Sequence, residues 1–401
     1  MSLRAGSAVV GQLLPLLTPF PKAPAASTVE SWLLRIGLYQ LRRPLPQADD
    51  WILIMDHTMQ LGASKCLIIV AIRQSVWQSL GRAVQLQDLT LVDLRPVIRS
   101  DGDRVFEQLN EAVKRVGSVR AILSDQGCDL VNGAKKFQQT SPQTLVLGDI
   151  AHAVAVLIKR RLLGDDDWNR FTSLCGQTQP RVKQTELGYL APPVLRVKGR
   201  YMNLDQLIRW STRMLALLER MLPPQDPAGA MGPLELKYGW VLEFRQQIAQ
   251  WGEVQRLKEL TLQYCRRWGY HAGAGGELAE VLSRQGVDQC NLEFRDKLVA
   301  LVASQSAGLA EVGPVPASSE ILESLIGKGK RMEGQHRAGG FTRMILAMAT
   351  SLVRLSNSTI IEALGSIREV DLSNWCRDQF GQTLHSLRQE HLGKHAGTKT
   401  A

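Results

Sequence analysis

The sequence predicts a mixed α/β fold, in which a five-stranded sheet is flanked by helices and interrupted by an all-helical segment. Two patterns predict this class. Between residues 49 and 160, short apolar and β-branched runs alternate with stretches of helical periodicity, as in a sheet covered by helices. Between residues 161 and 316, strand-like runs are scarce and helical stripes dominate.

Residues 1–26 allow two interpretations. An apolar stretch after Arg4, followed by small residues at 23–26, imitates a secretory signal with its cleavage site. Gln12 and Pro15 interrupt this stretch, so we favour a short helix and a proline-containing linker. Residues 27–39 then predict a capped helix followed by a glycine turn.

Three strands are expected next. The run 51–55 ends at Asp56. Residues 64–72 are almost uninterruptedly apolar, which is typical of a central strand covered on both faces. The third run, 89–95, is followed by Pro96. We expect Pro96 to end that strand, because proline lacks the N–H that a ladder needs.

Helices and strands then alternate. Apolar residues between 103 and 116 recur at helical spacing, and Gly117 is a favourable helix end. The core elements expected are a helix over 103–117, a strand over 119–124, a helix over 131–139, a strand over 144–148 and a helix over 153–159. The helices expected in the all-helical segment cover 204–222, 234–251, 253–268, 277–284 and 292–304.

Composition narrows the class of partner. The 401 residues are enough for two or three domains with buried cores. Lys and Arg number 48 against 38 Asp and Glu, and the formal charge of +10 favours a polyanion as partner.

The six cysteines form no CxxC pair and no disulfide framework, which indicates a reducing compartment. Since no apolar run approaches the ~18–20 residues of a membrane span, we expect a cytoplasmic protein.

Three acidic residues stand where carboxylates can converge. Asp56 and Asp125 each follow a predicted strand, and Glu323 lies early in a predicted helix. Carboxylates are hard ligands for Mg²⁺, and two such ions about 3.5–4 Å apart stabilise the reacting oxygens of phosphoryl transfer. Each residue also has an ordinary alternative. An aspartate at a strand end commonly caps a turn or helix, and an early helical glutamate complements the helix dipole.

The histidines do not suggest a second site. His57 follows Asp56, so in a continuous strand its side chain points to the opposite face. The three histidines near the C-terminus stand in a basic, glycine-containing tail without apolar support. We expect no metal site from either group.

Three short stretches resemble motifs of one family. Residues 124–127, Ser-Asp-Gln-Gly, resemble the Ser-Asp-x-Gly turn of integrases and DDE transposases. Residues 149–152, Asp-Ile-Ala-His, resemble the Asp/Cys-x-x-His element of several transposase families. Residues 318–328 resemble the stretch Ser-Ser-x-x-x-Glu-Ser-Leu-x-Gly-Lys that carries the terminal glutamate. The chain therefore resembles a bacterial insertion-sequence DDE transposase, with an all-helical insertion placed as in hAT-type transposases.

The resemblance implies a ribonuclease-H-like core in which Asp56, Asp125 and Glu323 are catalytic and bind two Mg²⁺ ions, with Mn²⁺ able to substitute. The residues that would support these ligands are Asp149, His152 and Glu320. Asp149 has an alternative as the cap of its own helix.

As activity, the resemblance implies cleavage of transposon ends and transfer of the 3′-hydroxyl into target DNA. Double-stranded DNA would be the partner, the protein would act as a homodimer or higher oligomer, and its location would be the bacterial nucleoid. One alternative is a catalytically inactive or domesticated transposase-derived DNA-binding protein, because the helix-turn-helix domain that precedes many transposase cores is reduced to a remnant. A second alternative is a structure-selective nuclease or resolvase on the same core.

DNA contacts are expected from basic and aromatic residues. Arg331, Arg337 and Arg343 follow the glutamate and suit phosphate contacts. Arg267 and Trp268 suit a backbone contact and stacking on an unpaired base. The alternative for a tryptophan in an amphipathic helix is a core anchor.

Five regions follow from these patterns. They are an N-terminal segment with the helix-turn-helix remnant (1–48), the first part of the catalytic core (49–160), the helical insertion (161–316), the core completion that carries the glutamate (317–356), and a C-terminal helix with a basic tail (357–401).

Overall fold

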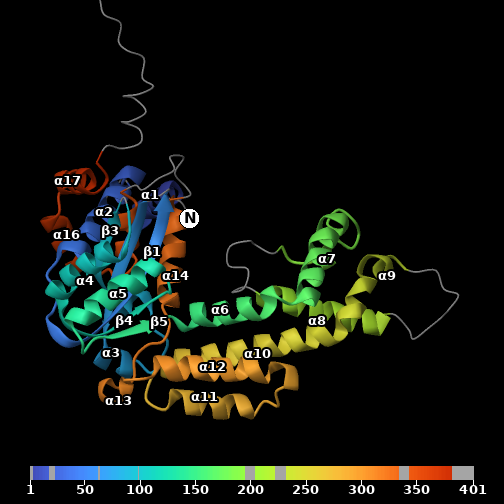
Figure 1. Ribbon diagram of the computed structural model, residues 1–401. Coiled ribbons are helices and arrows are strands. Elements are labelled where there is room, and N and C mark those ends of the chain that lie inside the picture. The colour runs from blue at the N-terminus through green and yellow to red at the C-terminus, as the bar shows by residue number, and fades with distance from the viewer. Residues whose placement is uncertain are drawn as a thin grey trace, which may run out of the picture. The chain divides into compact units, whose positions relative to one another are not determined.

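The chain forms two compact units, which Figure 1 shows in the computed structural model. One unit comprises Met1–Leu147 and Ser319–Ala401, and the other comprises Gly148–Ser318. The structure describes residues 3–17, 23–61, 64–97, 99–194, 204–221, 232–333 and 343–381. Nearly all of the sheet lies in the first unit, where helices from both ends of the sequence pack against it.

The five strands form one sheet in the order β3-β2-β1-β4-β5. Their bounds are Ala48–Leu61 for β1, Ser64–Arg73 for β2, Thr90–Val97 for β3, Gly117–Ser124 for β4 and Leu145–Gly148 for β5. Strands β1, β2 and β3 form an antiparallel meander, and β4 runs parallel to β1. This is the mixed, ribonuclease-H-like topology that the sequence predicts.

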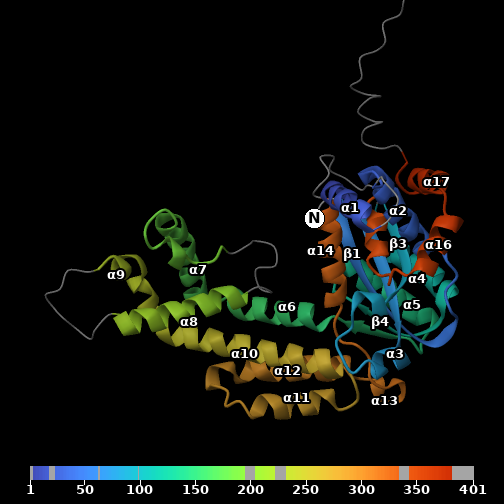
Figure 2. The ribbon, with the colours of Figure 1, turned by 180° about the vertical axis from the view of Figure 1, so that it is seen from behind.

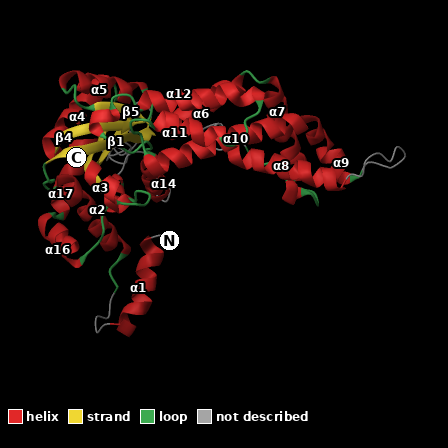
Figure 3. Cartoon of the chain, turned by 90° about the horizontal axis from the view of Figure 1, so that it is seen from below, coloured by secondary structure: helices red, strands yellow, loops and turns green. Residues whose placement is uncertain are grey.

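Helices α4 (Gly102–Val116) and α5 (Cys128–Thr140) cover one face of the sheet. Their apolar stripes pack against Leu53, Met55 and their neighbours, so that face is fully buried. The Asp101 side chain accepts the N–H of Arg104 and caps α4, which ends at Gly117 with a φ of 97°. Figure 3 shows α4 and α5 on one side of the strands, with α2 and α14 on the other side.

The opposite face is covered by helices that are remote from one another in sequence. Helix α2 (Ala26–Arg42) packs against β3 and α15 (Ile345–Thr350), and α14 (Glu320–Glu333) packs against β1. Figures 1 and 2 both show α14 beside β1. The other helices of this unit are α1 (Leu3–Leu17), α3 (Gln74–Ser79), α16 (Asn357–Ser366), α17 (Glu369–Phe380) and a 3₁₀ turn over Leu86–Asp88.

Three local expectations for the first unit prove wrong. The first strand does not end at Asp56, because β1 stays paired with β2 as far as Leu61. Pro96 does not end the third strand, which continues to Val97; β3 lies at the edge of the sheet, where one side of the backbone needs no ladder partner. The expected glycine turn after residue 36 is also absent, because α2 runs through Gly37 to Arg42. A Cβ at Gly37 would lie 2.1 Å from the carbonyl oxygen of Leu346, so glycine here permits close helix packing.

The described part of the second unit is mostly helical, with one isolated β-bridge between Tyr270 and Val315. Its helices are α6 (Ile150–Leu163), α7 (Asp166–Val182), α8 (Leu204–Met221), α9 (Pro233–Tyr238), α10 (Arg245–Trp268), α11 (Ala274–Ser283), α12 (Leu292–Gln305), α13 (Leu309–Val312) and 3₁₀ turns over Gly188–Leu190, Gly239–Phe244 and Gln289–Asn291. The break expected between 251 and 253 is absent, since α10 is continuous there. Within the described ranges, no helix combines the length and apolarity needed to cross a membrane.

Candidate active site

Backbone register brings Asp56 and Asp125 together. Strands β1 and β4 are parallel neighbours in which Ile54 pairs with Leu123 and Met55 pairs with Ser124. Each aspartate is the next residue, so the two side chains start from the same level and the same face of the sheet. Adjacent strands lie about 4.8 Å apart. Two carboxylates are therefore neighbours, one within β1 and the other directly after the end of β4.

Local hydrogen bonds fix both carboxyl groups. Oδ1 of Asp56 accepts the backbone N–H of His57 at 2.6 Å. Oδ1 of Asp125 accepts the N–H of Gly127 at 2.9 Å, which closes a tight turn just before α5. Both aspartates are half-buried. Each therefore keeps a side that can reach a ligand or solvent.

Glu323 is carried by α14, which packs against β1 and has Leu322 and Leu325 buried. The Glu323 side chain itself is exposed, and Glu320, one turn earlier, is half-buried. Among the residues that the structure describes, no group of three His, Cys, Asp or Glu side chains is arranged to hold a metal ion. The structure thus pairs two of the expected acids and places the helix of the third beside β1, without gathering all three.

Asp149 caps α6, as its alternative interpretation expects. Its side chain is buried and accepts the backbone N–H of His152 at 2.7 Å. His152 is half-buried. Both residues belong to the second unit. The cap accounts for an aspartate at this position by itself.

Sequence reasoning missed a polar group on the other face of the sheet. The Nε2 atom of His57 lies 3.1 Å from Oγ of Ser100 and 3.6 Å from Oδ2 of Asp129. Lys65 donates to the same Asp129 oxygen at 2.7 Å. The sequence signal that could have indicated this group is Asp129, an acidic residue in the first turn of α5, four residues after Asp125. His57 faces away from Asp56, as the strand alternation predicts.

The expected DNA-binding residues differ in their surroundings. Arg331 is exposed, and its Nε donates to the carbonyl oxygen of Gly327 at 3.2 Å. Arg343 forms ion pairs with Glu30 at 3.0 Å and with Glu369 at 3.6 Å. Arg337 lies outside the described residues. An arginine that already holds two carboxylates is a weaker phosphate ligand than one whose charge no carboxylate neutralises.

Arg267 and Trp268 end helix α10 in the second unit. The guanidinium of Arg267 lies 4.8 Å from the centroid of the Trp268 ring. Trp268 is 50% exposed. Trp268 is therefore available at the surface, unlike most core tryptophans. By contrast, Trp210 is half-buried and donates from Nε1 to the carbonyl oxygen of Leu190, which agrees with an anchoring role.

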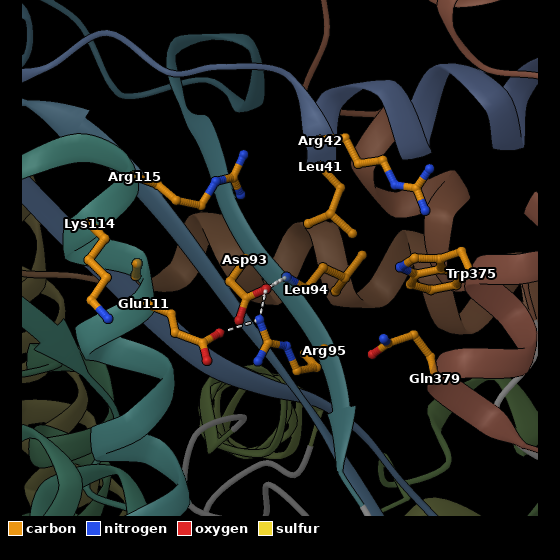
Figure 4. A pocket seen from close by; sticks show the side chains of 11 residues that line it. Leu41, Arg42, Asp93, Leu94, Arg95, Glu111, Lys114, Arg115, Trp375 and Gln379 are labelled. Carbon is orange, nitrogen blue, oxygen red and sulfur yellow. Dashed lines mark hydrogen bonds and ion pairs between the residues drawn. The ribbon is translucent and has the colours of Figure 1, made fainter. Parts of the chain in front are cut away.

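A separate polar pocket of about 550 Å³ lies at the edge strand β3, between α4, α2 and α17. Figure 4 shows Asp93 at its centre, with Arg95 bridging it to Glu111. Burial raises the pKa of the Asp93 carboxyl. Arg115 is held by the carbonyl oxygens of Val92 and Arg43. The pocket contains none of the predicted site residues, and many of its charged groups pair with each other or with the backbone.

Comparisons with known proteins add one finding. No family model and no curated protein matches the chain. Among solved structures, the chain is similar to a Drosophila P element transposase strand transfer complex, with a TM-score of 0.38 and 12% identity. The match covers 85% of this chain and 87% of that chain. At this level the likeness carries no conclusion, and the chemistry of the site follows from its residues.

Proposed function

We propose that the protein is a metal-dependent polynucleotidyl transferase of the DDE transposase type, which cleaves DNA at element ends and joins the 3′-hydroxyl to target DNA. One observation carries the proposal. Asp56, within β1, and Asp125, directly after β4, each follow the paired residues Met55 and Ser124 of these parallel strands, which puts them at one level and on one face of the sheet. Paired carboxylates at such a position are the basis of a two-metal phosphoryl-transfer site.

The donor set suits Mg²⁺ or Mn²⁺. Carboxylate oxygens are the ligands that these hard cations prefer, and Mg²⁺ commonly takes only one or two carboxylates while keeping water and substrate oxygens. We propose that Asp56 and Asp125 hold the metal and that Glu323 joins them from α14. When bound, the ions would stabilise negative charge on the reacting phosphate oxygens. The carboxylates of the chain would position the ions and supply the negative charge that attracts them.

DNA binding is proposed for the exposed cations. Arg331 follows Glu323 on the same helix and is exposed, so it suits a phosphate near the acids. The half-exposed Trp268 with its stacked Arg267 suits an unpaired base and its backbone. A homodimer or higher oligomer would bring two DNA ends together. Loss of a phosphate contact is expected to weaken binding at all sequences and to reduce its salt dependence.

The catalytic assignment is tested by nicking and strand-transfer assays on DNA that flanks the coding region, in Mg²⁺ or Mn²⁺. The test variants are Asp56→Asn, Asp125→Asn and Glu323→Gln, with Asp103→Asn as the matched surface control. Loss of a metal ligand should lower the rate by about 10²–10³-fold, since metal stabilisation of the transition state is worth several kcal/mol. Wild-type rates in all three test variants would refute the assignment.

The second candidate is a transposase-derived protein that binds DNA without cutting it. It is favoured by the exposure of Glu323 and by the lack of a three-ligand group among the described residues. It predicts DNA binding that is unchanged by a chelator and no nicking with any divalent ion. Metal-dependent strand transfer by the wild-type chain would exclude it. Products that are cut but never joined would instead indicate a nuclease.

A further inference from the structure

Four polar side chains gather next to the turn that carries Asp125. They are His57, Lys65, Ser100 and Asp129, which we call the Asp129 cluster. They come from β1, from β2, from the segment before α4 and from the first turn of α5. None of them is among the proposed metal ligands, and His57 projects from the face of the sheet that α5 covers.

Asp129 is the centre of this cluster. Its Oδ2 accepts from Nζ of Lys65 at 2.7 Å and lies 3.6 Å from Nε2 of His57. Burial opposes the ionisation of Asp129, but hydrogen bonds from Lys65 and Ser100 outweigh it and lower the pKa of this carboxyl. The cluster therefore contains one close ion pair, Lys65 with Asp129.

This ion pair is more enclosed than an ordinary surface pair. The side chains of Asp129 and Lys65 are 12% and 28% exposed. Removing one partner of a partly buried pair leaves the other charge without compensation, which disturbs the local structure more than the loss of an exposed pair does. Lys65 thus ties the start of α5 firmly to β2.

The start of α5 is continuous with the turn that presents Asp125. Gly127 donates to the Asp125 carboxylate, α5 begins at Cys128, and Asp129 follows directly. Any displacement of Asp129 is therefore transmitted to Asp125 within four residues. Across the sheet, β1 contributes both Asp56 and the neighbouring His57. The cluster consequently connects the two segments that must keep Asp56 and Asp125 in register.

We propose that the Asp129 cluster is a positioning device, in which the Lys65–Asp129 ion pair holds the Asp125 turn at the location where its carboxylate shares a metal ion with Asp56. The residues act on the metal only through Asp125. The inference rests on the proposed function, because it assigns the metal to Asp56 and Asp125. Groups that support metal ligands commonly change metal affinity by about 10–100-fold when they are removed.

The test is Mn²⁺ titration of the full chain, monitored by the electron paramagnetic resonance signal of free Mn²⁺. The variants are Lys65→Met, Asp129→Asn and their combination. Each single variant should weaken Mn²⁺ binding by about 10–100-fold, and the double variant should be no weaker than the worse single variant, since both remove one interaction. Lys136→Met is the matched control for Lys65→Met, because Lys136 lies on α5, as Asp129 does, and pairs with Asp103 in an exposed position.

Two outcomes separate this inference from the proposed function. If Asp125→Asn weakens Mn²⁺ binding while Lys65→Met and Asp129→Asn bind like the wild type, the positioning role is wrong and the function stands. If Asp125→Asn leaves Mn²⁺ binding unchanged, the proposed function fails. In that case, amide hydrogen exchange at residues 125–130 decides whether the cluster orders the turn. Faster exchange in Lys65→Met than in Lys136→Met supports ordering, and equal exchange overturns it.

Discussion

At the scale of single residues, the surroundings of each polar group decide its role. Asp56 lies within β1, Asp125 and Asp149 directly follow strands, and all three accept a nearby backbone N–H. Asp149 is buried as a helix cap, whereas Asp56 and Asp125 are half-buried neighbours on central strands. The same residue type thus supplies a structural cap in one place and a candidate ligand pair in another.

Gly37 is expected to tolerate no side chain. In Gly37→Ala the new methyl group would lie 2.1 Å from the carbonyl oxygen of Leu346, so α2 and α15 must separate. We expect a loss of about 1–3 kcal/mol in the free energy of unfolding, as for other overpacked contacts. Urea denaturation measures it. Gly252→Ala is the control, because nothing lies within 4 Å of its added Cβ, and it should be neutral or stabilising.

His57 should make stability depend on pH. Burial, which outweighs the attraction of Asp129, lowers its pKa in the folded chain, while the unfolded chain titrates near the ordinary value of about 6.5. The unfolded state then binds more protons, so this contribution is present above about pH 6.5 and is lost as the pH falls through the folded pKa. Urea midpoints between pH 7.5 and 5 should fall less steeply in His57→Gln. Equal slopes would contradict the assignment.

At the scale of elements, helix starts position the polar residues. The first turn of α5 carries Asp129, the cap of α6 is Asp149, and α14 presents Glu323 after packing its apolar face on β1. Each helix is placed by its buried stripe, and its exposed or terminal residues then follow. The chemistry of the first unit therefore depends on how α5 and α14 pack on the sheet.

The cap of α6 gives a prediction that separates structure from catalysis. Asp149→Ala should lower the free energy of unfolding by about 0.5–2 kcal/mol because the N–H of His152 loses its acceptor. Asp149→Ser should recover most of this stability, since serine is also a good cap. Thermal unfolding measures both variants. If Asp149→Ser is as stable as the wild type but loses all strand cleavage, a role beyond capping is required.

At the scale of the whole molecule, the chain divides into two units with different construction. The first unit needs residues from both ends of the sequence, since α14 packs against β1 and α15 packs against α2. The second unit is one continuous stretch. Its ends are tied together, because Ile150 donates its N–H to the carbonyl oxygen of Ala317 at 2.9 Å.

A fragment of residues 148–318 should therefore fold by itself. It retains the aromatic core in which Trp168, Phe171, Phe244 and Trp251 contact one another. We expect helical circular dichroism, a near-ultraviolet signal from packed tryptophans and a cooperative thermal transition. A fragment that is helical but lacks the near-ultraviolet signal and the transition would show that the first unit is needed for its packing.

Periodicity and chain order by themselves determined the elements of the sheet. The apolar run at 64–72, the helical spacing at 103–116 and the turn at 124–127 are local signals, because burial and backbone conformation there depend on neighbouring residues. The expected end of β3 at Pro96 and the turn at Gly37 failed for the same physical reason. Their outcome depends on an edge position in the sheet and on a partner helix more than 300 residues away.

For the candidate site, the sequence named Asp56 and Asp125, while the tertiary structure decided that they are neighbours. Only strand register can place two residues so far apart in sequence at one level of a sheet. The Lys65–Asp129 ion pair lay beyond sequence reasoning, since it joins β2 to α5 across 64 residues. Local patterns thus determined which residues could act, and long-range packing decided which of them meet, because free energy from burial is gained only when distant segments come together.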